Sequence, residues 1–261
     1  MRREDILARF KADLRAGKVL LGMQHSSGSE AVVEMLAYCG FDFVLIDMEH
    51  SGYSITVTES LVRAAEAAGI VAFIRVLHND KHLIMQAMET GAQGVVVPHV
   101  RSRADCEQAI AAMRYLPDGV RGKTSGSRAA RWGASDWHAY QQWANTEPLL
   151  IPLLEDKEAI EVLDEIVAVP GLQVVCLGPG DLSQSYGLPG QGLRAAPVMA
   201  ALERALALCA LRGIAVMTLP IPDLTNEFTR GLLAKGVRLI WYGVDLMCMG
   251  KYFRQLAEVK G

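Results

Sequence analysis

The sequence lacks the features that mark membrane proteins and nucleic-acid-binding proteins. No apolar run reaches the roughly 20 residues that a membrane span requires. There is no block of lysine or arginine and the net charge is -3, which argues against nucleic acid or an anionic membrane as the main partner. The charged first 18 residues have helical spacing and no continuous apolar stretch of a secretory signal. A small ligand, neutral or anionic, is therefore the partner class that stays open.

Cysteine pairs with redox or zinc-site spacing are also missing. The five cysteines are scattered along the chain without a CxxC motif: Cys39, Cys106, Cys176, Cys209 and Cys248. This pattern favours free thiols in a reducing compartment over a disulfide framework. We therefore expect a cytoplasmic protein.

Short apolar runs and segments of helical period alternate along the whole chain. Eight runs predict strands: Val19–Met23, Phe43–Ile46, Val71–Arg75, Gly94–Val97, Leu149–Leu154, Val174–Leu177, Ile214–Met217 and Leu239–Trp241. Eight segments predict helices: Glu30–Ala37, Val57–Ala68, His82–Glu89, Asp105–Arg114, Glu158–Val167, Val198–Leu211, Leu224–Ala234 and Asp245–Val259. Several runs are apolar almost throughout, as expected of parallel strands that are covered on both faces.

This alternation predicts an α/β fold with a parallel sheet. Eight repeats without a Pro/Gly/Ser linker favour closure into one (β/α)8 TIM barrel over an open doubly wound sheet. We expect a single domain over residues 1–261. Residues 115–136 interrupt the pattern as a long loop rich in Gly, Ser and Arg, in which Arg121, Arg128 and Arg131 either face an anion or belong to an exposed connector.

Polar residues follow the predicted strands at the ends that meet in the active-site face of such a barrel. They include Asp47, Glu49, His50, Arg75, His99, Glu155 and Asp181. Glu155 and Asp181 on neighbouring strand ends would supply oxygen ligands suited to Mg²⁺ or Mn²⁺. Either carboxylate alone would be read as a helix cap, but the convergence of Arg75 and His50 on the same face favours a site.

The segment Gly178–Asp181, GPGD, is a second candidate element of this site. Its glycines leave the backbone open, so N–H groups at the start of the next helix can bind a carboxylate or a phosphate, although a Pro/Gly turn is also common in loops. Of the remaining histidines, His25 and His99 follow strands and are weak candidates for the pocket. His78 and His82 have zinc-like spacing, yet a solvated helix start explains them better.

Several motifs in order resemble the HpcH/HpaI aldolase family, the metal-dependent class II pyruvate aldolases. They are LIDMEH at 45–50, FIRV at 73–76, GAQGVVVPHV at 91–100, RYLPDGVRG at 114–122, LLED at 153–156 and LGPGDLSQSYG at 177–187. The resemblance covers nearly the whole chain. It implies a barrel of the phosphoenolpyruvate/pyruvate-binding type, a divalent metal (Mg²⁺, Mn²⁺ or Co²⁺) and a homo-oligomer, a hexamer built as a dimer of trimers.

The resemblance also implies roles for individual residues. Glu155 and Asp181 resemble the metal ligands, Arg75 the arginine at the keto oxygen, His50 the catalytic acid/base and Asp47 the residue that orients it. The substrate carboxylate would lie in the Gly178–Pro179–Gly180 loop, on the backbone amides of Gly180 and Asp181. The implied reaction joins the enolate of pyruvate or a related 2-oxo acid, such as hydroxypyruvate, to an aldehyde, and cleaves 4-hydroxy-2-oxo acids in reverse.

Two positions near the substrate depart from the family pattern. Leu153 stands where members close to the type enzyme carry glutamine, and Gln24 stands in an early segment that is more apolar in the family. Both differences bear on the choice of oxo acid and aldehyde.

Three other functions compete with this prediction. An acyl-CoA lyase of the citrate lyase β-subunit or malyl-CoA type shares a similar Arg, Glu and Asp set, but the LIDxEH arrangement and short chain favour free oxo acids. A Schiff-base aldolase needs a lysine at a strand end, and none is placed there. A non-catalytic barrel that binds metal and oxo acid is favoured by Leu153 but would have no use for His50. The last predicted helix carries more apolar surface than one barrel face needs, so it either packs on a partner or closes the barrel.

Overall fold

The apolar runs form eight parallel strands that pair in chain order and close into a barrel, because helices cover their outer faces and side chains fill the interior. The structure, a computed structural model, describes residues 2–260. The strands are β1 Leu20–His25, β2 Phe43–Asp47, β3 Val71–Arg75, β4 Gly94–Val97, β5 Leu149–Leu154, β6 Val174–Leu177, β7 Ala215–Thr218 and β8 Leu239–Val244. The predicted TIM barrel is confirmed.

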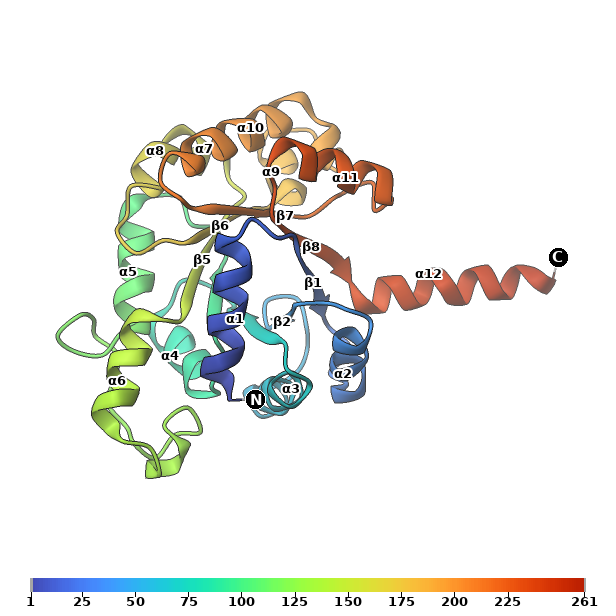
Figure 1. The fold of residues 1–261 in the computed structure, drawn as a ribbon. Helices are drawn as coiled ribbons and strands as arrows, with labels where there is room; N and C mark the ends of the chain where they lie inside the picture. The colour runs from blue at the N-terminus through green and yellow to red at the C-terminus, as the bar shows by residue number, and fades with distance from the viewer. Residues whose placement is uncertain (1, 261) are drawn as a thin grey trace.

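Helices alternate with the strands around the outside of the barrel (Figure 1). They are α1 Arg3–Arg15, α2 Glu30–Tyr38, α3 Ile55–Ala68, α4 Lys81–Glu89, α5 Arg103–Met113, α6 Trp137–Thr146, α7 Lys157–Glu161, α8 Leu163–Ile166, α9 Pro179–Ser185, α10 Ala196–Ala210, α11 Asn226–Lys235 and α12 Asp245–Ala257. Short 3-10 turns, η1 Arg131–Gly133, η2 Gly192–Arg194 and η3 Glu258–Lys260, complete the set. The helix predicted over 158–167 is divided into α7 and α8 at Val162, whose backbone leaves the helical region.

The barrel interior is closed at one end by α1, which precedes the first strand. Ile6, Leu7 and Phe10 are buried against the inner side chains of the strands. The ring of Phe10 meets Phe43 and Phe73 edge-on, at centroid distances of 6.0 and 5.6 Å. Burial of such a side chain contributes roughly 2–3 kcal/mol, so α1 is an integral part of the core.

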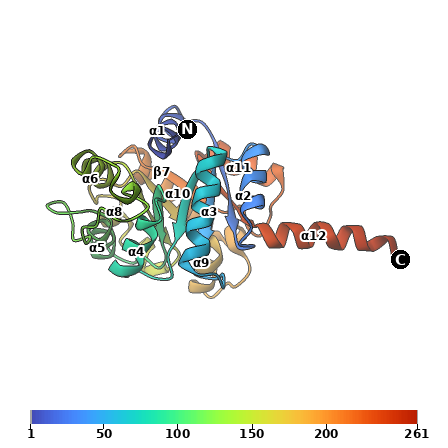
Figure 2. The same ribbon diagram turned by 90° about the horizontal axis from the view of Figure 1, so that it is seen from below.

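The carboxyl ends of the strands lie at the end of the barrel opposite α1. Figure 2 shows α1 on one side of the barrel and α9, which follows β6, on the other. Because all strands are parallel, the segments that follow them meet at this second end. This geometry brings Asp47, Arg75 and Glu155 to one mouth.

Helix α12 does not fold back onto the barrel. It projects away from β8 into solvent (Figure 1), and it contacts β1 and β8 only near its start. Large apolar side chains along it are exposed, among them Met247, Tyr252 and Phe253. The body of the barrel therefore leaves the apolar face of its last helix uncovered.

Two further sequence features can be checked against the fold. All five cysteines are free, so the expected absence of a disulfide framework is confirmed. Among residues 2–260, no helix combines the length and apolar character needed to cross a membrane.

Candidate active site

The mouth of the barrel holds a buried network that starts from the last residues of β2 and β3. The strand register pairs Asp47 with Arg75. Arg75 donates from Nε to Asp47 Oδ1 and from Nη2 to Asp47 Oδ2, both at 2.8 Å. Gln24, on β1, donates from Nε2 to the same Oδ2 at 2.7 Å. Asp47 thus holds Arg75 in place by a bidentate ion pair, the geometry in which arginine and carboxylate bind most strongly.

Glu49 is a member of this network to which the sequence predictions gave a place at the mouth but no role. Its Oε2 lies 3.0 Å from Arg75 Nη1. Burial by itself would lower the pKa of Arg75, but Asp47, Glu49 and Glu155 together raise it. Arg75 is therefore a permanent cation that faces three carboxylates, two at the end of β2 and one at the end of β5.

His50 lies at the rim of the mouth rather than inside it. Its side chain is 65% exposed, and its Nε2 is 3.8 Å from Glu49 Oε2. The contact expected between Asp47 and His50 is not among the hydrogen bonds of residues 2–260, because both Asp47 oxygens accept from other groups. In this geometry Asp47 orients Arg75 and Gln24 instead.

Glu155 is a buried carboxylate just beyond β5. It is 3% exposed, and its Oε1 accepts a hydrogen bond from the backbone N–H of His99 at 3.0 Å. Burial raises the pKa of Glu155 to about 7; the His99 N–H opposes this, while the charges of Asp181 and Glu49 add to it. A carboxylate in this position is destabilised by its neighbours, and a nearby cation would relieve that repulsion.

Asp181, in the first turn of α9, is exposed beside Glu155. Within the part of the chain that the structure describes, no group of three or more His, Cys, Asp or Glu side chains is arranged to hold a metal. The chain therefore offers two carboxylates, with further oxygens left to water or to a ligand. This donor set fits Mg²⁺, which keeps several waters and takes few protein ligands.

The loop between β6 and α9 is shaped by a glycine that makes room for Glu155. A Cβ on Gly178 would lie 3.0 Å from Glu155 Oε2 and 3.1 Å from a methyl carbon of Leu153. A side chain at this position would require Glu155 or Leu153 to shift, so glycine suits the close passage of the loop. Leu153 itself is buried in the interior of the barrel, so the position presents a methyl group to this part of the mouth.

Trp241, on β8, lies beneath the guanidinium of Arg75 and was missed by the sequence predictions. The ring centroid is 5.3 Å from Arg75 Cζ, and the side chain is 1% exposed. A tryptophan at the end of the predicted run Leu239–Trp241 is the sequence signal that would have indicated it. Arg75 thus crosses the mouth from β3 toward β8.

The remaining histidines divide between the rim and the outer wall. His99 has Nδ1 3.0 Å from Asp156 and 3.7 Å from Glu155, at the edge of the mouth. His25 faces away from Gln24, its neighbour on the strand, and its Nδ1 lies 2.9 Å from Asp245 at the start of α12. His78 and His82 are exposed at the start of α4, as expected of a solvated helix start.

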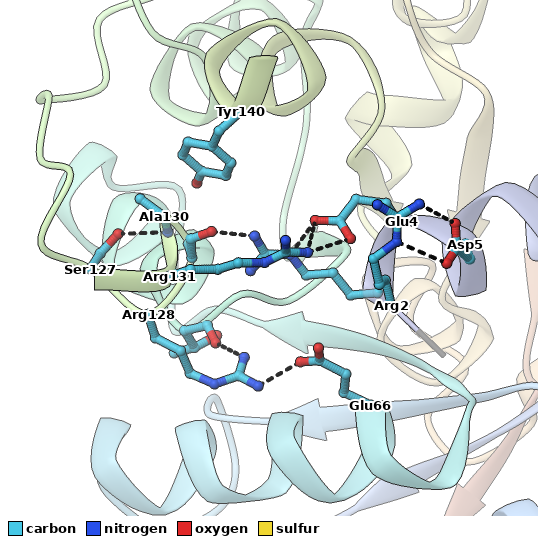
Figure 3. Close-up of polar contacts among 12 residues, drawn as sticks. Arg2, Glu4, Asp5, Glu66, Ser127, Arg128, Ala130, Arg131 and Tyr140 are labelled. Atoms are coloured by element: carbon cyan, nitrogen blue, oxygen red, sulfur yellow. Dashed lines mark hydrogen bonds and ion pairs between the residues drawn. The ribbon is translucent and has the colours of Figure 1, made fainter. Parts of the chain in front are cut away.

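The arginines of the long loop bind carboxylates of the chain itself. Arg121 pairs with Glu89, Arg128 with Glu66 and Arg131 with Glu4. Figure 3 shows the pairs of Arg128 and Arg131, together with residues at the start of α1. Because this loop follows α5, which runs back from the mouth, it lies at the opposite end of the barrel, where these ion pairs tie it to α1, α3 and α4. The connector interpretation therefore explains this loop.

Comparison with known proteins identifies a family, curated relatives and solved structures that this chain resembles. The HpcH/HpaI aldolase/citrate lyase family matches residues 21–250. The chain is 37% identical over 183 residues to a hydroxypyruvate/pyruvate aldolase of Sagittula stellata, covering 70% of this chain and 72% of that protein. It is 33% identical over 248 residues to a pyruvate aldolase of Rhizobium etli, covering 95% of each. A solved HpcH/HpaI aldolase/citrate lyase family protein of Burkholderia cenocepacia superposes with a TM-score of 0.88 at 30% identity, covering 97% of this chain and 99% of that one.

Proposed function

The chain belongs to the HpcH/HpaI aldolase/citrate lyase family, and we propose that it is a divalent-metal-dependent aldolase acting on 2-oxo acids. It forms the enolate of pyruvate or of a relative such as hydroxypyruvate and adds that enolate to an aldehyde. In the reverse direction it cleaves 4-hydroxy-2-oxo acids. The similarity to proteins named pyruvate aldolase and hydroxypyruvate/pyruvate aldolase supports this choice of donor.

The observation that carries the proposal is the fixed cation of Arg75 facing a cluster of carboxylates. Two carboxylates, Asp47 and Glu49, hold the guanidinium, while Glu155 lies near enough to affect its pKa. An enolate is an oxyanion, so a donor group that is already oriented and desolvated stabilises it without reorganisation. Arg75 would hydrogen-bond the keto oxygen as negative charge develops there.

Glu155 and Asp181 are the residues that would hold the metal ion, Mg²⁺, Mn²⁺ or Co²⁺. The ion, when bound, supplies the Lewis acidity that makes the protons next to the keto group easier to remove. Glu155 is suited to this task because its buried charge is poorly compensated by the groups around it. The backbone amides of Gly180 and Asp181, at the start of α9, would hold the carboxylate of the oxo acid.

Proton transfer is assigned to His50, which stands exposed at the rim where an aldehyde enters. A histidine in that position can protonate the new hydroxyl group or deprotonate it in the cleavage direction. Asp47 contributes to the reaction by holding Arg75 in position, not by contacting His50. Leu153 and Gln24 line the substrate region and bear on the choice of donor and acceptor.

Two coupled assays, one of pyruvate release and one of acetyl-CoA release, test this function against the thioester lyase. The protein is supplied with Mg²⁺ or Mn²⁺ and offered either a free 4-hydroxy-2-oxo acid or malyl-CoA, with chelated protein as the control. We expect pyruvate from the free acid only when metal is present. Cleavage of the thioester alone would identify an acyl-CoA lyase. If neither substrate is cleaved, the protein is a non-catalytic binding protein.

The proposal includes a homo-oligomer assembled through α12. The side chains of Leu246, Met249, Tyr252, Phe253 and Leu256 share one face of this helix, which projects from the barrel. A second copy of the chain is the partner that would always be present to cover it. The hexamer implied by the resemblance, and the cytoplasmic location, stay predictions.

A further inference from the structure

The stacking of Arg75 on Trp241 is the feature of the mouth that the proposed chemistry does not yet use. Arg75 Cζ lies 5.3 Å from the centre of the indole ring, within the distance at which a cation is attracted to the face of an aromatic ring. Both side chains are almost fully buried, Arg75 at 5% exposure and Trp241 at 1%. Desolvated pairs of this kind are stronger than exposed ones.

The ion pairs of Arg75 and the stacking restrain different motions of its side chain. Asp47 accepts hydrogen bonds from Nε and Nη2, and Glu49 forms an ion pair with Nη1, so these two carboxylates fix the direction in which the guanidinium points. Contact with a ring face limits movement out of the guanidinium plane. The two sets of contacts together leave the remaining N–H donors of Arg75 in a defined orientation.

The indole N–H shows that the ring is not retained for its hydrogen bond. Trp241 Nε1 is buried and has no hydrogen-bond partner among residues 2–260. A buried donor without a partner is unfavourable, so phenylalanine or leucine would fill this interior at lower cost if packing were the only requirement. Tryptophan has the ring face that attracts cations best among the aromatic side chains.

We propose that Trp241 is a positioning residue for 2-oxo acid binding, whose ring face holds the Arg75 guanidinium in the orientation that contacts the keto oxygen. This inference rests on the proposed function, in which Arg75 is the keto-oxygen donor. The ring acts through Arg75 and touches no reacting atom. It follows that another aromatic ring can replace it, whereas an aliphatic side chain of comparable packing cannot.

Three variants separate this role from ordinary packing. Trp241→Phe keeps a ring face and removes the N–H, and Trp241→Leu removes the ring. Phe43→Leu is the matched control, because Phe43 is a buried aromatic of the same barrel interior that packs on Phe10 and Phe73. Thermal unfolding of each variant measures the loss of packing separately from the loss of binding.

The binding measurement is the Kd for pyruvate of the Mn²⁺-loaded protein, determined below the unfolding temperature of every variant. We expect Trp241→Leu to raise the Kd by about 10- to 30-fold, the range that a desolvated cation–π contact supports. Trp241→Phe should raise it by less than about threefold, and Phe43→Leu should leave it unchanged. An equal rise in Trp241→Leu and Phe43→Leu, or in Trp241→Phe and Trp241→Leu, would overturn the inference.

Tryptophan emission gives a second test that does not need the leucine variant to fold. The other three tryptophans, Trp132, Trp137 and Trp143, lie in the long loop and α6, before β5. We expect pyruvate to change the emission of the wild-type protein but not that of Trp241→Phe. The same change in both proteins would contradict the inference, whereas a folded, Mn²⁺-loaded wild type that neither binds pyruvate nor exchanges its protons would contradict the proposed function itself.

Discussion

Arg75 donates to both carboxylate oxygens of Asp47, at 2.8 Å each, across neighbouring positions of β2 and β3. Asp47 is fully buried, and Arg75 is nearly so. A buried ion pair contributes little net stability, because desolvation offsets the attraction, but breaking it leaves a charge without compensation. The pair therefore fixes the position of a cation at the mouth, which is its value for the proposed chemistry.

Substitution of Asp47 should separate stability from catalysis. Asp47→Ala leaves the Arg75 charge buried without its main partner and should lower the free energy of unfolding by about 3–5 kcal/mol. Asp47→Asn keeps the size and one acceptor, so we expect kcat/KM to fall about 10- to 100-fold at a smaller loss of stability. Urea unfolding and steady-state kinetics measure the two effects.

Asp42→Asn is the control for this pair of variants. Asp42 is a partly buried aspartate that precedes β2 and accepts from the backbone N–H of Leu21 at 2.9 Å, away from the mouth. The Asp42→Asn variant should be less stable than the wild type but should keep the wild-type kcat/KM. If Asp47→Asn keeps the wild-type kcat/KM, the proposed use of the Arg75 pair is wrong.

How far the sequence predicts this molecule depends on whether a feature is local. The strands are predictable because both faces of each are covered, so runs such as Gly94–Val97 are apolar throughout. Asp47, Arg75 and Glu155 are predictable as site candidates because polar residues that end such runs meet at one edge. For these features, the position of a residue along the chain is enough to predict where it lies in the barrel.

Features that depend on contacts across the barrel could not be predicted in the same way. The stacking of Arg75 on Trp241 joins β3 to β8, and nothing in the spacing of the two residues indicates it. The orientation of His25 toward Asp245 depends on the strand pleat, since one step along β1 reverses the side-chain direction. The helix at 245–257 was predicted, but its direction away from the barrel depends on tertiary contacts that the sequence pattern does not contain.

Metal binding should release protons near neutral pH. Burial raises the pKa of Glu155 to about 7, so a large part of the metal-free protein carries a protonated Glu155 at pH 6.5 and must lose that proton to bind the ion. We expect Mn²⁺ affinity to rise between about pH 6 and 8. Calorimetric titration in two buffers of different ionisation enthalpy measures the proton count, and Glu155→Gln is the control. An affinity independent of pH would exclude Glu155 as a ligand.

Acid should weaken the junction between β1 and α12. Burial opposes ionisation of Asp245, but His25 and the groups of Ser26 and Ser27 outweigh it and lower the pKa of Asp245 to about 2. A lowered pKa stabilises the folded state above the ordinary value near 4, and this stability is lost as the pH falls toward 2. The contribution is about 2 kcal/mol.

Asp245→Asn is the variant that measures this contribution. Chemical unfolding of the wild type should show stability falling between about pH 4 and 2, and the variant should show a flatter profile over that interval. Parallel profiles would mean that Asp245 has no part in the acid dependence.

The two ends of the long loop should differ in their contribution to stability. The Arg121 side chain is fully buried against Glu89, so Arg121→Ala should cost about 3–5 kcal/mol. Arg131 is partly exposed beside Glu4, and Arg131→Ala should cost less than about 1 kcal/mol. Thermal unfolding measures both. Neither substitution should alter the Kd for pyruvate of the folded protein. Weaker pyruvate binding by folded Arg131→Ala would instead indicate that the loop binds an anion.

An acidic side chain on the apolar face of α12 should disrupt assembly. Phe253 is 62% exposed on that face, and Phe253→Asp should reduce the mass in solution, measured by light scattering after gel filtration. Gln255→Asp adds the same charge on the opposite face of the helix and should leave the mass unchanged. A wild-type protein that is monomeric at micromolar concentration would disprove the assembly proposal.

The central claim, enolate formation at the mouth, is tested most directly by proton exchange. NMR in deuterium oxide follows the methyl protons of pyruvate and the C3 protons of hydroxypyruvate with metal-loaded protein, chelated protein and Glu155→Ala. We predict exchange with at least one of the two acids in the loaded wild type only. Folded, metal-loaded protein that exchanges neither would contradict the account.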